Sequence, residues 1–168
     1  MPLSEPQRTI ADHPARHRVA ACGRRFGKSF LAIREMARFA RLPRQRVWYV
    51  SPTYRQSKQN LWLPLKERLL AVRWVSKFNE QDLSATLVNG STIALRGADN
   101  PDALRGVGLN FLVVDEASDV KEEAWTQVLS PRLLWRYLLV SVIVPPPELR
   151  RPRWMLQSFR SGRAGSRN

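Results

Sequence analysis

The run CGRRFGKS at residues 22–29 ends in a glycine, a lysine and a serine. In such a turn, backbone N–H groups and the first turn of a following helix point toward bound phosphate groups. Lys28 would reach the β- and γ-phosphates of a nucleotide, the hydroxyl of Ser29 would bind Mg²⁺, and Gly27 would let the backbone approach closely. The common pattern has its first glycine one position before Gly23, so a plain glycine turn stays an alternative interpretation.

Two adjacent acids, Asp115 and Glu116, follow the apolar run at residues 111–114. At the carboxyl end of a buried strand, side chains lie at the sheet edge where open α/β folds bind ligands. We expect Asp115 to hold Mg²⁺ through water and Glu116 to orient or deprotonate an attacking water. Taken alone, the pair also fits a solvated strand end. Its occurrence together with Lys28 and Ser29 favours the catalytic interpretation.

Apolar patterning predicts the elements that would position both motifs. Strands are expected at residues 18–22, 47–50, 74–78, 85–88, 92–95 and 111–114, with Asn89-Gly90 as a hairpin turn. Helices are expected from the glycine turn to Pro43, at 54–72 with Pro64 as a local fault, and at 122–129. This alternation predicts an α/β fold with a mostly parallel sheet and helices on both faces.

Composition and charge restrict the class of protein. The chain has 168 residues, enough for about one domain, and its longest apolar run is shorter than the roughly 20 residues that span a bilayer. We therefore expect a soluble protein without a membrane partner, and the single cysteine excludes an internal disulfide. The net charge of +14 favours polyanionic partners such as nucleic acid.

Three spaced motifs resemble the ATPase domain of phage terminase large subunits: GRRFGKS at 23–29, LRG at 104–106 and VVDEA at 113–117. The shifted glycine is typical of that family. The resemblance covers about residues 7–133. It implies a P-loop NTPase fold of the ASCE type, with ATP and Mg²⁺ bound and hydrolysed to drive double-stranded DNA into a capsid.

The resemblance also implies roles for single residues. It assigns nucleotide binding to the loop residues Gly23, Arg24, Arg25, Phe26, Gly27, Lys28 and Ser29, and Mg²⁺ to Ser29 and Asp115. Catalysis is assigned to Glu116, to Arg24 or Arg25 as the loop arginine that responds to the γ-phosphate, and to Arg105 as a finger on a neighbouring subunit's nucleotide. Gln7 would read adenine, with a plain surface glutamine as the alternative.

The family further implies a homo-oligomeric ring that works with a portal and a small terminase subunit. The location would be the cytoplasm of a bacterial host, with transient attachment to the phage procapsid. If Arg105 comes from a neighbour in a ring, an isolated monomer would hydrolyse ATP slowly.

The last part of the chain departs from the family pattern. From residue 132 onward there are eight arginines and one acidic residue, Glu148, and no coupling motif or carboxylate-rich nuclease domain is recognisable. We expect a partial ATPase domain at 1–133, incomplete at its C-terminal end, and a basic tail at 134–168. Residues 137–144 are compatible with one more strand, and disorder is expected after 144. This predicts a truncated or prophage-remnant form with impaired turnover and no nuclease activity.

Two alternatives remain open at the level of sequence. One is a non-enzymatic basic remnant that binds nucleic acid through its tail. The other is a different P-loop motor such as a helicase, although the chain has no room for the second lobe that a helicase needs.

Overall fold

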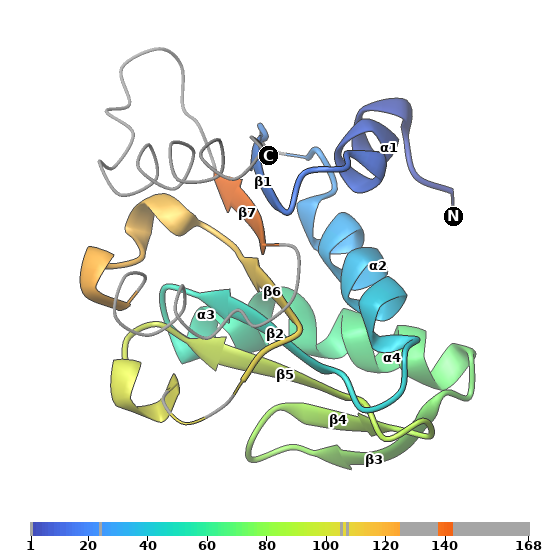
Figure 1. Ribbon diagram of the computed structural model, residues 1–168. Coiled ribbons are helices and arrows are strands. Elements are labelled where there is room, and N and C mark those ends of the chain that lie inside the picture. The colour runs from blue at the N-terminus through green and yellow to red at the C-terminus, as the bar shows by residue number, and fades with distance from the viewer. Residues whose placement is uncertain (1, 24, 105, 107, 125–137, 143–168) are drawn as a thin grey trace, which may run out of the picture.

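The computed structural model describes residues 2–23, 25–104, 106, 108–124 and 138–142. Its helical elements are α1 (Glu5–Asp12), α2 (Lys28–Ala40), α3 (Tyr54–Ser57), the π-helix η1 (Lys58–Trp62), α4 (Leu63–Ala71) and the 3-10 helices η2 (Pro101–Leu104) and η3 (Ala117–Asp119). Its strands are β1 (His17–Ala21), β2 (Arg46–Ser51), β3 (Val75–Asn79), β4 (Ser84–Leu87), β5 (Thr92–Gly97), β6 (Phe111–Val114) and β7 (Leu138–Val142). Figure 1 shows these elements gathered around one twisted sheet.

The sheet has the strand order β1-β7-β6-β2-β5-β4-β3. The pairs from β1 to β5 are parallel, whereas β5, β4 and β3 form an antiparallel meander at one edge. The predicted mostly parallel α/β sheet is therefore confirmed. The hairpin expected at Asn89-Gly90 joins β4 to β5, and Gly90 has a φ of 78°, which a residue with a Cβ adopts only with strain.

Burial explains why the central strands are continuous apolar runs. All four residues of β6 are buried, as are the last five of β2, because both faces of these strands are covered. In the edge meander, β4 instead alternates between buried and less buried positions. Such alternation is typical of an antiparallel strand with one solvated face.

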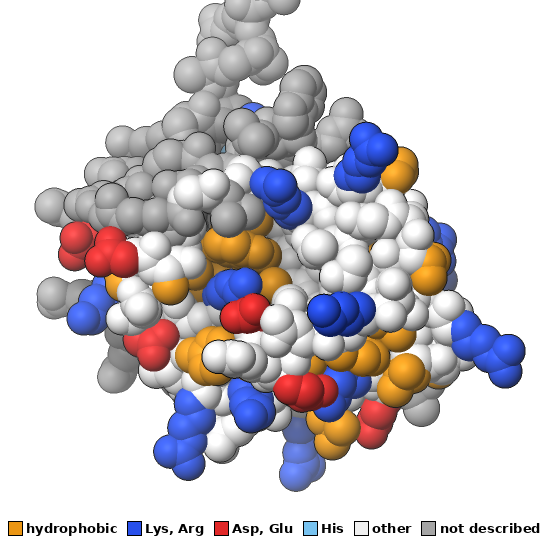
Figure 2. Space-filling view, turned by 90° about the horizontal axis from the view of Figure 1, so that it is seen from below, with side chains coloured by type: hydrophobic (Ala, Val, Ile, Leu, Met, Phe, Trp, Pro, Cys, Tyr) orange, Lys and Arg blue, Asp and Glu red, His pale blue; other side chains and the backbone are white. Residues whose placement is uncertain are grey.

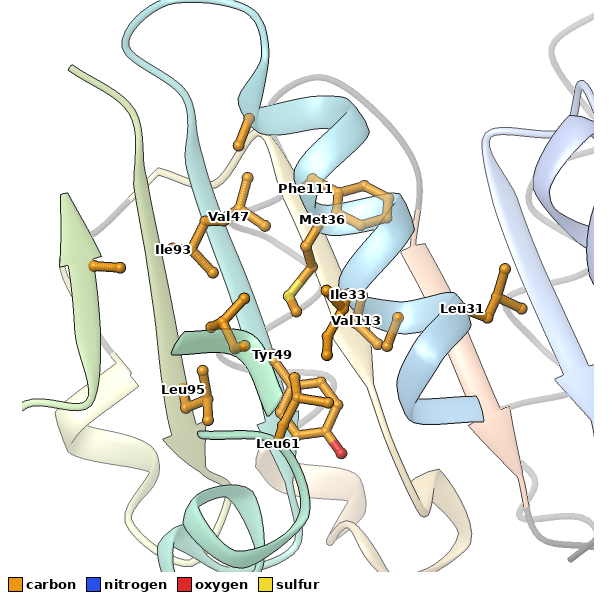
Figure 3. Packing of buried hydrophobic residues seen from close by; sticks show 14 of the residues in the cluster. Leu31, Ile33, Met36, Val47, Tyr49, Leu61, Ile93, Leu95, Phe111 and Val113 are labelled. Atoms are coloured by element: carbon orange, nitrogen blue, oxygen red, sulfur yellow. The ribbon is translucent and has the colours of Figure 1, made fainter. Parts of the chain in front are cut away.

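Two apolar layers cover the faces of the sheet. On one side, α1, α2, η1 and α4 contribute to a core that includes Met36 and Phe111, both fully buried. Figure 3 shows Ile33 and Met36 on α2 directed toward this face of the sheet. Phe39 also stacks on Phe111, with ring centroids 4.2 Å apart. On the other side, the described cover comes from η2, η3 and residues 120–124.

The helix expected at residues 54–72 is present as three consecutive pieces, α3, η1 and α4. Thr53 caps α3 through its hydroxyl, which accepts from the backbone N–H of Gln56. The π-helical turn of η1 ends directly before α4, and Pro64 lies in the first turn of α4. Proline is tolerated in the first turn of a helix, where its missing backbone N–H would have no helical partner. The irregularity predicted at Pro64 therefore lies at the change from π-helix to α-helix.

The strand compatible with residues 137–144 is present as β7, which pairs in parallel with both β1 and β6. The sheet thus extends beyond the boundary at residue 133 that the composition predicts. The helix expected at 122–129 lies mostly outside the described residues, and so does the segment after 144 for which we expected disorder. Within the described part of the chain, no helix is both long and apolar enough to cross a membrane.

Candidate nucleotide site

Two of the motifs singled out in the sequence, the glycine turn before α2 and the acidic pair, meet at the carboxyl ends of parallel strands. The loop at 22–27 leaves the end of β1, and Asp115 and Glu116 leave the end of β6. Strand β2 ends at the same edge of the sheet, since it pairs in parallel with β6. Open α/β sheets bind ligands at this edge.

The turn of the loop depends on Gly27, which caps α2 in the left-handed region with φ 82° and ψ 35°. Its carbonyl accepts the first helical hydrogen bond from the N–H of Leu31 at 3.0 Å. The backbone angle therefore favours glycine here, and a Cβ at this position would also lie 2.6 Å from Nε2 at the end of the Gln7 side chain. A Cβ on Gly23 would meet no atom of the described residues within 4 Å, so their packing does not require glycine there.

Lys28 and Asp115 face each other across the site. Nζ of Lys28 lies 4.0 Å from Oδ1 of Asp115, and the two side chains are 17% and 8% exposed. Because Lys28 opens α2 and Asp115 follows β6, this approach joins the two predicted motifs into one site. A small pocket beneath them is lined by Lys28 and Asp115 together with Cys22, Tyr49 and four apolar residues. Burial raises the pKa of the Cys22 thiol, while the charge of Lys28 opposes that shift.

Asp115 is held by contacts with β2. The hydroxyl of Tyr49 donates to Oδ2 of Asp115 at 2.6 Å, and the N–H of Asp115 donates to the carbonyl of Val50 at 2.8 Å. Burial and the neighbouring carboxylate raise the pKa of Tyr49, so the phenol remains a proton donor. The sequence analysis did not single out Tyr49. Its only signal is a hydroxyl-bearing side chain within an otherwise apolar predicted strand.

Glu116 takes an unusual backbone conformation, with φ 50° and ψ 45°. Its Oε2 accepts a hydrogen bond from Nε2 of Gln56 at 3.4 Å, and the Oε1 of Gln56 is itself fixed by the backbone N–H and hydroxyl of Thr53. The pKa of Glu116 is raised, first by burial and then by the charge of Asp115, while Lys28 opposes the shift. Gln56 is a second site residue that the sequence analysis missed.

Gln7 is buried rather than on the surface, with 7% of its area exposed. Its Nε2 donates to the carbonyl of Phe26 at 2.8 Å and lies 3.5 Å from that of Gly27, and its Oε1 accepts from the N–H of Ser4 at 3.0 Å. The interpretation of Gln7 as a plain surface residue is therefore wrong. The structure brings it against the phosphate-binding loop.

The remaining predicted residues differ in how far the structure describes them. Ser29 is partly buried in the first turn of α2, and Phe26 packs against the core while its carbonyl faces Gln7. Arg25 is exposed, with a left-handed φ of 63°. Arg24 and Arg105 lie outside the described residues.

A glycine-capped loop leads into a helix that begins with lysine, and an aspartate–glutamate pair follows β6 at the same edge of the sheet. This arrangement is that of a P-loop NTPase fold. The chain belongs to the family of phage terminase large subunits. Its residues 20–147 match the family model described as terminase large subunit, T4likevirus-type, N-terminal.

Similar proteins agree with this assignment. The terminase large subunit of Thermus virus P23-45 is 31% identical over 179 residues, which cover 95% of this chain and 36% of that protein. The chain thus spans about a third of the length of such relatives. The large terminase ATPase domain of Thermus phage P74-26 superposes with a TM-score of 0.71 at 27% identity, covering 84% of this chain and 65% of that one.

The fold extends to more distant structures. The large terminase of another thermophilic bacteriophage, determined in complex with ADP, superposes with a TM-score of 0.70. It is 18% identical, and the match covers 86% of this chain and 39% of that one.

Proposed function

We propose that the chain binds ATP with Mg²⁺ at residues 23–29 and hydrolyses it as the motor domain of a phage terminase, which drives double-stranded DNA into a capsid. The approach of Lys28 to Asp115, at 4.0 Å between the start of α2 and the end of β6, carries this proposal. It joins a phosphate-binding cation to the carboxylate that a nucleotide-bound metal needs.

The polar groups of the site suit a triphosphate with its metal. Mg²⁺ is commonly held by one or two protein oxygens together with water and substrate phosphates, and Ser29 and Asp115 supply a hydroxyl and a carboxylate. Tyr49 donates to Oδ2 of Asp115, whereas Oδ1 accepts from the N–H of Glu116 at 3.1 Å and lies 4.0 Å from Nζ of Lys28. When bound, the metal would neutralise charge on the β- and γ-phosphates. The ADP complex of the more distant large terminase supports nucleotide binding in this fold.

Glu116 is the proposed residue that orients or deprotonates the attacking water. Its carboxylate lies at the edge of the site, next to Asp115 and steadied by Gln56. A raised pKa brings a carboxylate closer to the proton affinity that a general base needs at neutral pH.

Three arginines complete the proposal on the basis of family resemblance. Arg24 or Arg25 would respond to the γ-phosphate from within the loop, and Arg105 would act on the nucleotide of a neighbouring subunit in a ring. An arginine supplied by a neighbour raises phosphoryl-transfer rates by about 10³-fold or more. The isolated chain is therefore expected to bind ATP well and to hydrolyse it slowly.

DNA is the proposed polymer on which the motor acts. The net charge of +14 attracts a polyanion, and Figure 2 shows several Lys and Arg side chains projecting from the described part of one face, with Asp and Glu side chains among them. The partners expected for the family are a portal and a small terminase subunit, in the cytoplasm of a bacterial host and at the procapsid. The charge equally favours the alternative, a basic module that binds nucleic acid without hydrolysing ATP.

Calorimetric titration with ATP, in Mg²⁺ and in EDTA, separates the two functions. The ATPase proposal predicts tighter binding in Mg²⁺, and it predicts that Ser29→Ala removes most of this gain while leaving the affinity in EDTA nearly unchanged. Ser76→Ala, on the exposed face of β3, is the matched control. Absence of ATP binding in both conditions would leave only the nucleic-acid-binding alternative.

A further inference from the structure

The N-terminal helix α1 contacts the phosphate-binding loop through one side chain, that of Gln7. Its amide nitrogen donates to the carbonyl of Phe26 at 2.8 Å and is 3.5 Å from the carbonyl of Gly27, directly before Lys28. These carbonyls therefore face α1. Because N–H and C=O groups of one peptide point in opposite directions, this contact favours N–H groups that face away from α1.

The other end of α1 is fastened by two arginines. Arg18 of β1 donates to the carbonyls of Ile10 and Ala11 at 2.9 and 2.8 Å, and Arg38 of α2 donates to that of Ala11 at 3.0 Å. These bonds satisfy carbonyls that the end of a helix leaves without partners, and cations are favourable there.

A buried carboxylate holds both arginines in place. Glu35 of α2 accepts from Arg18 at 2.6 Å, with side-chain exposures of 1% and 4%, and Oε1 of Glu35 lies 3.6 Å from Arg38. Alongside these contacts, a groove is lined by Leu3, which precedes α1, and by residues of α1, α2 and α4 that include Ala11, Ile33 and Leu69. The polar contacts near the two ends of α1 thus fix the position of this helix.

Both polar atoms of Gln7 already have partners within the chain. A bidentate contact to adenine takes one N–H of the amide and one lone pair of its oxygen, and it also requires the side chain to face the base. In the structure, Nε2 faces the loop carbonyls and Oε1 accepts from the N–H of Ser4. With 7% of its area exposed, Gln7 is directed at the loop and not outward.

We propose that α1 positions the phosphate-binding loop for every nucleoside triphosphate alike, with Gln7 as its contact to the loop and the Arg18–Glu35–Arg38 cluster as its anchor. Gln7 is then a positioning residue and not a reader of adenine. This inference rests on the proposed nucleotide binding at the loop. A loop held in its binding conformation before the ligand arrives loses less entropy on binding, which strengthens affinity.

Nucleotide selectivity separates positioning from base recognition. Titration of the full chain with Mg·ATP and with Mg·GTP is expected to show that Gln7→Ala weakens both by the same factor, roughly tenfold, as for the loss of one strong hydrogen bond. Thr9→Ala, at an exposed position of the same helix, is the control and should change neither affinity. Loss of affinity for ATP alone, or no loss for either nucleotide, would overturn the inference.

A double-mutant cycle tests whether the anchor acts through Gln7 or only stabilises the fold. Arg38→Gln removes one hydrogen bond to the end of α1. Because Arg38 is half-exposed and Glu35 is buried, this substitution destabilises the fold less than a substitution of Glu35 would. We expect it to weaken ATP and GTP equally in the wild-type background and to have no further effect when Gln7 is already alanine. Arg34→Gln, on the exposed side of α2, is the matched control. Equal effects of Arg38→Gln in both backgrounds would show that the anchor does not act through Gln7.

Failure of this inference is distinguishable from failure of the proposed function. If Lys28→Ala retains wild-type affinity for both nucleotides, the loop is not their binding site and the proposed function fails. If Lys28→Ala abolishes binding while Gln7→Ala discriminates between bases, only the positioning role is wrong.

Discussion

Tyr49 and Asp115 are joined across two neighbouring strands by a hydrogen bond of 2.6 Å, which the buried phenol donates to the carboxylate. Tyr49 pairs in register with Val113, two residues before Asp115. The side chain that holds the proposed metal-binding carboxylate therefore comes from β2 and not from β6. The orientation of Asp115 depends on the packing of these two strands.

The variant Tyr49→Phe keeps the aromatic ring and removes only this donor. We expect the free energy of unfolding, measured in urea, to fall by about 1–3 kcal/mol, because an oxygen of a buried carboxylate loses its hydrogen-bond partner. The Mg²⁺ dependence of ATP binding should weaken as well, since Asp115 is no longer held. Tyr54→Phe is the control, because the hydroxyl of Tyr54 bonds to Gln81 at an exposed position away from Asp115. Unchanged stability and Mg²⁺ dependence would show that the bond is dispensable.

Gln56 is expected to affect turnover more than nucleotide binding. Its amide contacts Oε2 of Glu116, and Thr53 fixes the amide on the other side. Gln56→Ala should lower the single-turnover rate of ATP hydrolysis roughly tenfold, the order expected for one hydrogen bond to a charged group, while the Kd for Mg·ATP stays within about twofold. Gln59→Ala, at an exposed position of η1, should leave both quantities unchanged. A rise in Kd with an unchanged rate would assign Gln56 to binding instead.

His17 predicts a pH dependence of stability. Burial, with a smaller contribution from the charge of Arg16, lowers the pKa of His17 in the folded chain below the ordinary histidine value. Below that ordinary value the unfolded chain binds a proton that the folded chain resists, so the free energy of unfolding falls as the pH falls through this window. Nδ1 of His17 also has no hydrogen-bond partner among the described residues.

Urea unfolding at pH 7 and pH 5.5 measures this effect. His17→Asn should lose less stability between the two values than the wild type does, because its side chain cannot take up the proton. His13→Asn, at an exposed position, serves as the control and should behave like the wild type. A wild-type loss of stability that persists fully in His17→Asn would assign the pH dependence to other groups.

The local elements around the site follow from the sequence. An apolar run, a glycine turn and an amphipathic helix predict β1, the loop and α2, because hydrophobic spacing and backbone freedom are local properties. The apolar run before Asp115 likewise predicts β6. Parallel strands end at one edge, so the approach of Lys28 to Asp115 could also be expected before the structure was known.

The contacts that steady the site could not be predicted in this way. Tyr49 and Gln56 lie far from Asp115 and Glu116 along the chain, and they meet only because β2 is the neighbour of β6. Strand order is not encoded in local spacing, and neither is the insertion of β7 between β1 and β6. The burial of Gln7 cannot be predicted locally for the same reason, since it depends on where α1 packs.

The central claim is that the turn before α2 binds the triphosphate through Lys28. Isothermal titration of Mg·ATP into the wild type, Lys28→Ala and the control Lys77→Ala, which alters an exposed lysine of β3, tests it most directly. We expect Lys28→Ala to weaken binding by at least about a hundredfold, because a charge-assisted contact to phosphate is lost, while Lys77→Ala binds like the wild type. A Kd for Lys28→Ala within about twofold of the wild type would contradict the account.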